Sequence, residues 1–125
     1  MTTDPGDLER IVAFAMDLAR EGRTELLAEY VDGGFPANHP DPDGNTALML
    51  AAYHGHADTV SMLLERGADV DRLNNRGQSP LAGALFKGED EVVQVLRTAG
   101  ADLDAGTPSA RDTARMFGTE HLLAD

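Results

Sequence analysis

The sequence predicts an all-α protein in which about four helix–turn–helix units stack side by side, joined by short β-like turns. Glycines recur at a fixed spacing of 33 residues, and apolar residues between them recur at the three- or four-residue spacing of helices. A fixed period of this length indicates a stacked repeat architecture. The glycines in phase are Gly22, Gly55 and Gly88, then Gly34, Gly67 and Gly100, then Gly44 and Gly77.

The period divides the chain into four units within a single domain, 1–125. Residues 41–73 and 74–106 form two clear repeats. Residues 7–40 keep the glycine phase but differ elsewhere, and 107–125 is a shortened unit whose preceding turn is three residues shorter. We expect these two to be an N-terminal capping unit and a truncated C-terminal capping unit, because an end repeat has one polar outer face.

The first unit contains two apolar stripes at helical spacing, so we expect two helices in it. The first stripe consists of Leu8, Ile11, Val12, Ala15, Leu18 and Ala19, with Asp7 as a plausible cap. The second consists of Leu26, Leu27, Tyr30 and Val31. The following segment, FPANHPDPDGN, contains three prolines and is predicted to be a loop whose Phe35 packs onto the core.

Each later unit begins its first helix with a hydroxyl residue. The side chains of Thr46, Ser79 and Ser109 can accept hydrogen bonds from free N–H groups at a helix start. Pro80 suits the first helical position, where its missing N–H has no consequence. Gly55 ends one such helix, since glycine readily takes the left-handed conformation found there.

The second helix of each middle unit is predicted by a separate apolar stripe. These residues are Val60, Leu63 and Leu64 in one unit and Val92, Val93, Val95 and Leu96 in the next. Gly67 and Gly100 then release the chain into the next turn. Small residues such as Ala51 and Ala52 allow neighbouring helices to approach closely.

These residues together resemble the ankyrin-repeat family, whose pattern runs D-x-x-G-x-T-P-L-H-x-A-A, then G-H, V-x-x-L-L and G-A-D-V-N. Unit 41–73 departs from it at Ala47, Met49 and Asp71, where the family has Pro, His and Asn, and unit 74–106 has Ala82 at the His position. The resemblance implies a protein-binding module that recognises a partner with its concave face, formed by turn tips and first helices.

The repeat register places on that face the positions that differ between units. The predicted partner-binding residues are Asp43, Asn45, Tyr53, His54, Asn75, Arg76, Gln78, Phe86, Lys87, Met116 and Phe117. Tyr53 and Phe86 share one phase, which Met116 takes in the last unit, so these side chains should form one line. Exposed aromatic clusters mark interfaces. The alternative is that Phe86 or Phe117 turns inward.

The charge balance disfavours several partners. The formal net charge is −12, with 22 acidic and 10 basic residues. Nucleic acid and anionic membranes both require a positive face, so neither is expected. The acidity favours solubility or, alternatively, the electrostatic steering of a partner with a basic surface. The N-terminus has no basic segment followed by an apolar one, so we expect a cytoplasmic monomer without a signal peptide or membrane span.

Motifs for metal binding and catalysis are missing from the sequence. Without cysteine, thiolate metal sites are excluded. A calcium loop starting at Asp41 would need Gly and Glu where Thr46 and Ala52 stand. His56 occupies the family's structural position, and His54 is expected to be exposed, so the two do not predict a metal pair. Nucleophile-elbow, zinc-protease and phosphate-loop motifs are missing too, so no cofactor and no enzyme activity are predicted.

The function predicted is therefore binding of a partner protein, as an inhibitor or regulator. The alternatives are an accessory subunit or a self-associating structural protein, with an enzyme ranked below both. Arginine far outnumbers lysine, of which Lys87 is the only example, and alanine is abundant. This composition favours a bacterial source.

Overall fold

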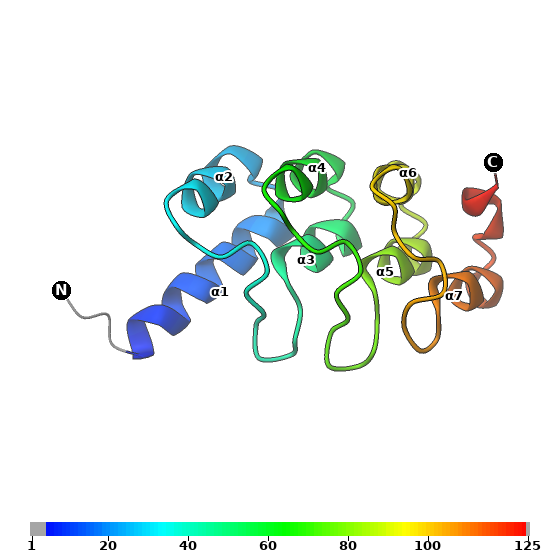
Figure 1. The fold of residues 1–125 in the computed structure, drawn as a ribbon, viewed down its shortest axis with the longest axis horizontal. Helices are drawn as coiled ribbons and strands as arrows, with labels where there is room; N and C mark the ends of the chain where they lie inside the picture. The colour runs from blue at the N-terminus through cyan, green and yellow to red at the C-terminus, as the bar shows by residue number, and fades with distance from the viewer. Residues whose placement is uncertain (1–4, 125) are drawn as a thin grey trace.

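The computed structural model describes residues 5–124 and forms, within that range, α-helices and one 3-10 helix without any strand. Figure 1 shows two rows of helices, with α1, α3, α5 and α7 in one and α2, α4 and α6 in the other. The helices are α1 (Pro5–Glu21), α2 (Thr24–Asp32), α3 (Ala47–Tyr53), α4 (Ala57–Glu65), α5 (Pro80–Lys87), α6 (Asp90–Thr98), α7 (Ala110–Phe117) and the 3-10 helix η1 (Glu120–Leu123). The predicted all-α solenoid is confirmed.

The predicted hydroxyl caps begin α3, α5 and α7. The side chain of Thr46 accepts from the N–H of Met49, and Ser79 accepts from Ala82, at 3.3 and 3.0 Å. Ser109 caps α7 in the same way. Three helices of the first row therefore start for one local reason, the satisfaction of N–H groups that have no partner within the helix.

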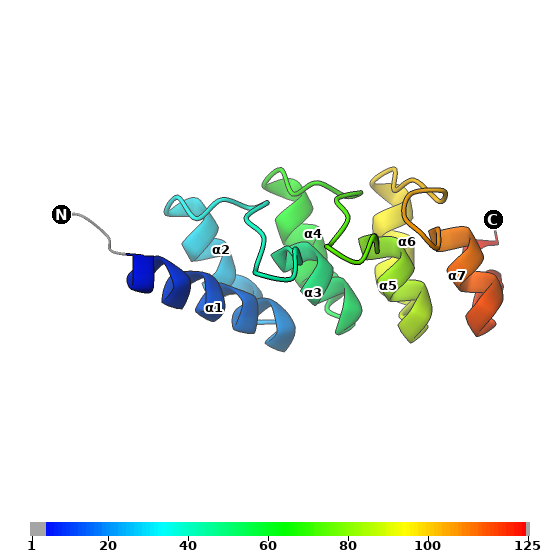
Figure 2. The ribbon, with the colours of Figure 1, turned by 90° about the horizontal axis from the view of Figure 1, so that it is seen from below.

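The predicted cap of α1 is wrong. The helix already includes Pro5, so Asp7 lies inside its first turn, where it pairs with Arg10. At 17 residues α1 is also longer than the other helices, and Figure 2 shows its start running away from α3. Leu8 and Ile11 of the predicted stripe are consequently exposed.

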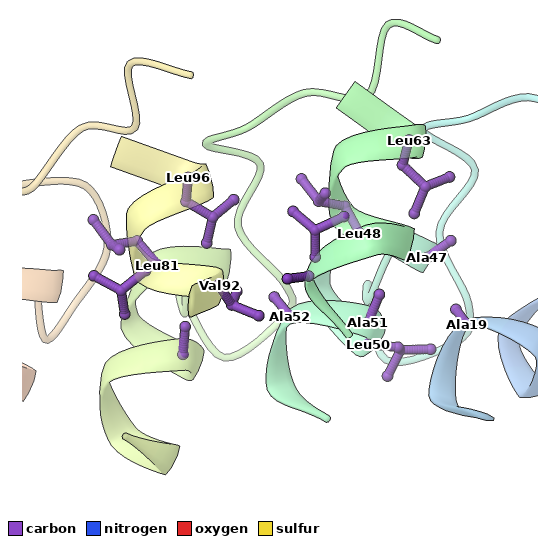
Figure 3. Close-up of a cluster of buried hydrophobic side chains, with 14 of the residues drawn as sticks. Ala19, Ala47, Leu48, Leu50, Ala51, Ala52, Leu63, Leu81, Val92 and Leu96 are labelled. Carbon is purple, nitrogen blue, oxygen red and sulfur yellow. The ribbon is translucent and has the colours of Figure 1, made fainter. Parts of the chain in front are cut away.

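The core lies between the two rows of helices and continues from unit to unit (Figure 3). Ala51 and Ala52 are completely buried, which allows α3 to lie close to its neighbours. Phe35 is partly buried against this core, so its predicted packing is confirmed. Among the large side chains that are fully buried are Met16, Leu18, Leu27, Leu48, Leu63, Leu81, Leu85 and Leu96.

The predicted β-like turns are closed by hydrogen bonds without forming strands. The N–H of Asp41 donates to the carbonyl of Asn45 at 2.8 Å, and the N–H of Asn74 donates to that of Gln78 at 3.0 Å. In Figure 1 these turns project from the side of the first row of helices. The turns therefore form one wall of the groove that lies beside the first row of helices.

A series of side-chain hydrogen bonds joins the loops that follow α2, α4 and α6. The carbonyl oxygen of the Asn38 side chain accepts from the N–H of Asp69 at 2.7 Å, while its amide donates to the carbonyl of Gly67 at 3.1 Å. One repeat later, Asp71 accepts from the N–H of Asp102 at 2.8 Å. A carboxylate has no N–H, so Asp71 cannot make the second bond that Asn38 makes.

We expect Asp71→Asn to raise the free energy of unfolding by about 0.5–1.5 kcal/mol, the net value of one added hydrogen bond. The new amide would reach Gly100, which stands one repeat after Gly67. Urea denaturation would measure the change, and Asn38→Asp should shift stability in the opposite direction. If neither substitution changed the free energy of unfolding, these side-chain hydrogen bonds between loops would not stabilise the protein.

Candidate functional site

A groove of about 600 Å³ lies between the projecting turns and the first row of helices. Its lining comes from the turns at 41–45 and 74–78, from Pro108 and from α3, α5 and α7, with His54 at the end of α3. The apolar and small residues among the lining are Met49, Leu50, Ala82, Gly83, Pro108 and Met116. A Cβ on Gly83 would lie in ordinary van der Waals contact with Tyr53 at 3.7 Å and with Met49 at 3.9 Å, so the side chains of the groove pack closely around this glycine.

Three half-exposed aromatic rings run along the groove. The rings of Tyr53 and Phe86 are stacked, with centroids 6.2 Å apart and an interplanar angle of 10°. Phe117 meets Phe86 edge-on at 4.6 Å. Phe86 and Phe117 are therefore exposed and do not turn inward. We call Tyr53, Phe86 and Phe117 the aromatic ladder. In the last unit it is therefore Phe117 that contacts Phe86, while Met116 lines the groove beside it.

The wall formed by the turns is organised around Asn74. Its side-chain oxygen accepts from the N–H groups of Arg76 and Gln78, at 2.9 and 3.0 Å. Because backbone N–H groups can only donate, this fixes the orientation of the Asn74 amide. Its nitrogen then donates to the side-chain oxygens of Asn45 and Gln78, both at 3.0 Å.

One basic residue lines the groove and another stands beside it, although the chain is strongly acidic. Arg76 lies in the lining beside the turns, and the ammonium of Lys87 stands 5.1 Å above the ring of Tyr53, as in a cation–π contact. Desolvation lowers the pKa of His54, and electrostatic repulsion from the nearby basic side chains, Arg20 and Lys87 among them, lowers it further. His54 is therefore neutral at neutral pH. Among the described residues, no Asp or Glu lines the groove.

The structure brings most of the predicted binding residues together. Those that line the groove are Asn45, Tyr53, His54, Arg76, Gln78, Phe86, Met116 and Phe117. Lys87 reaches it only through Tyr53. Asp43 and Asn75 instead join neighbouring turns, because the N–H of Asn75 donates to the carbonyl of Asp43 at 3.0 Å and its side chain donates to Pro42 at 3.1 Å.

Sequence reasoning missed several lining residues because they occupy framework positions. Met49 and Ala82 stand where the ankyrin pattern has His. This departure from the pattern could have identified them as residues that line the groove. Asn74 and Thr113 had no such signal. Their place in the groove depends on how neighbouring units stack.

The two neighbouring histidines serve different roles. A ring nitrogen of His56 lies 2.7 Å from the carbonyl oxygen of Arg20, which ties unit 41–73 to the preceding one, so its predicted structural role is confirmed. His54 is exposed, as predicted. Within residues 5–124, no three His, Asp or Glu side chains gather closely enough to hold a metal ion.

In the described part of the chain, no helix is both long enough and apolar enough to cross a membrane.

The fold and the groove define a repeat solenoid with an open groove along one side. The ankyrin repeats family model, in three copies, matches residues 15–107, and the chain belongs to this family.

Curated relatives share about half of this chain. It is 41% identical over 56 residues to an ankyrin repeat protein of Pseudomonas aeruginosa, covering 45% of this chain and 33% of the relative. It is 48% identical over 56 residues to serine/threonine-protein kinase 12 of Arabidopsis thaliana, covering 45% and 12%. It is 42% identical over 55 residues to ankyrin repeat family A protein 2 of Mus musculus, covering 44% and 18%. The chain thus spans a third or less of the length of these relatives.

Proposed function

We propose that this protein is a binding module that docks a partner protein in the groove between its turns and first-row helices. Ankyrin repeats are in general protein–protein interaction modules, and the fold is a non-catalytic one. The observation that carries the proposal is the aromatic ladder, whose rings are about half exposed although they are apolar. Aromatic anchors in a groove are the side chains that most often dominate binding energy.

We further propose that the protein acts as a cytoplasmic monomer in a bacterium, as an inhibitor or regulator of its partner and without catalysing a reaction. Its alanine- and arginine-rich composition supports the bacterial source. The formal charge of −12 supports steering of a partner whose surface is basic where it lies outside the groove. Association that slows as salt increases would support this steering.

Phe86→Ala should weaken partner binding by about 1–3 kcal/mol, or roughly 5- to 150-fold, because it removes the central ring of the aromatic ladder. The measurement is capture from host lysate followed by calorimetric titration of the captured protein. Phe14→Ala is the matched control, since Phe14 on α1 is 44% exposed and Phe86 is 45% exposed. Both variants should keep the wild-type circular dichroism spectrum.

A partner that bound wild type and both variants equally would show that the groove is not the binding surface. Loss of binding in the Phe14 variant alone would move the surface to α1.

Self-association is the second candidate function. Leu8, Ile11 and Phe14 form an exposed apolar strip on α1 that a second copy could cover. Sedimentation velocity over a range of concentrations would reveal it as a mass that rises with concentration and falls in an Ile11→Glu variant. A constant monomer mass would exclude it.

A further inference from the structure

We infer that the groove binds an extended segment of a partner in which an apolar residue is flanked by carboxylates. This rests on the proposed function and adds the chemistry of the partner. The groove combines an apolar centre, a set of unused N–H donors and two unpaired cations. A segment with apolar and acidic side chains complements all three.

The unused donors follow from the orientation of Asn74. Because its nitrogen donates to the side-chain oxygens of Asn45 and Gln78, the amide nitrogens of those two residues point elsewhere. Within the described chain, neither of these nitrogens donates to a protein acceptor. Two residues that line the groove therefore keep free N–H groups, together with the Arg76 guanidinium, which can only donate. Such donors select carboxylate and carbonyl oxygens.

The cations at the groove differ from most other basic residues of the chain. Five arginines are engaged in ion pairs, namely Arg10, Arg20, Arg66, Arg111 and Arg115. Over residues 5–124, neither Arg76 nor Lys87 has a carboxylate partner. Among the residues that the structure describes, none in the groove lining is acidic, although acidic residues outnumber basic ones 22 to 10 in the sequence. The positive charge here is thus available to a ligand.

The groups at the groove indicate which residues the bound segment needs. The aromatic ladder faces an apolar side chain, with Arg76 near the turns and Lys87 over the Tyr53 ring. Carboxylates next to the apolar residue would meet these two cations. The net charge of −12 disfavours such a segment elsewhere on the surface, and at physiological salt this repulsion is screened beyond about 8 Å.

The test uses two pools of labelled synthetic peptides of about ten residues, which extend to roughly 33 Å. Apolar positions are randomised identically in both pools, and the flanking charged positions are all Glu in one pool and all Lys in the other. Fluorescence anisotropy at physiological salt should give the Glu pool an apparent Kd at least about tenfold lower for the wild-type protein. Arg76→Glu/Lys87→Glu should abolish or reverse that preference.

Arg23→Glu/Arg72→Glu is the matched control, because it makes the same change in net charge at exposed residues outside the groove lining. It should keep the preference for the Glu pool. Equal binding of both pools, preference for the Lys pool, or no binding of either would overturn the inference. In those cases, a partner protein that binds wild type but not the Phe86→Ala variant would still support the proposed function. Failure of this inference can therefore be told apart from failure of the proposed function.

Discussion

Leu63→Ala should lower the free energy of unfolding by about 2–5 kcal/mol, the usual cost of a cavity left by a buried leucine. Leu63 lies on α4 and is 0% exposed, within the core that joins the two rows of helices (Figure 3). A small domain is stable by only about 5–15 kcal/mol, so this loss is a large fraction of the total. Urea denaturation would measure it as a lower midpoint with an unchanged slope.

Leu73→Ala provides the control for this core substitution. Leu73 is 41% exposed in the loop before the second turn, so its removal leaves little or no cavity. Its variant should unfold within about 0.5 kcal/mol of wild type. If the two variants lost equal stability, the burial of Leu63 would not explain its effect.

Gly44→Ala should lower stability by about 2–4 kcal/mol, because it adds backbone strain and a clash between two turns. Gly44 has a φ of +80°, which costs an L-residue about 1–2 kcal/mol. A Cβ at this position would also lie 2.7 Å from the backbone nitrogen of Asn75. That nitrogen donates to Asp43 at 3.0 Å, so it cannot move away without losing a bond between neighbouring turns.

Gly67→Ala separates the two causes. Gly67 has a φ of +89°, but a Cβ there would meet no atom within 4 Å. Its variant should therefore show the strain alone, about 1–2 kcal/mol. Equal losses in thermal or urea denaturation of the two variants would mean that the contact between Gly44 and Asn75 adds nothing.

Much of the fold could be predicted because its causes are local. The cap at Thr46 needs only a hydroxyl and an N–H three residues later, and both lie within one repeat. The stacking of units follows from apolar stripes that a single helix pair cannot bury. The start of α1 was predicted wrongly because Asp7 suits a cap and the first turn of a helix equally well.

The candidate site was predictable only in part. The register identified Tyr53 and Phe86 as neighbours, since equivalent positions of stacked repeats lie side by side. It could not show that Phe117, and not Met116, contacts Phe86 in the last unit. That contact depends on how the shortened last unit packs. Asn75 was predicted to bind a partner, yet its side chain holds two turns together.

The sequence alone thus determined the repeat, the helix starts, the apolar core and the family resemblance, all of which depend on spacings within 33 residues. The tertiary structure decided which groups meet in the groove. The free amides of Asn45 and Gln78 depend on the orientation of Asn74, and the acid-free lining depends on which turns face which helices. The physical reason is that local hydrogen bonds form within one unit, whereas the groove exists only between units.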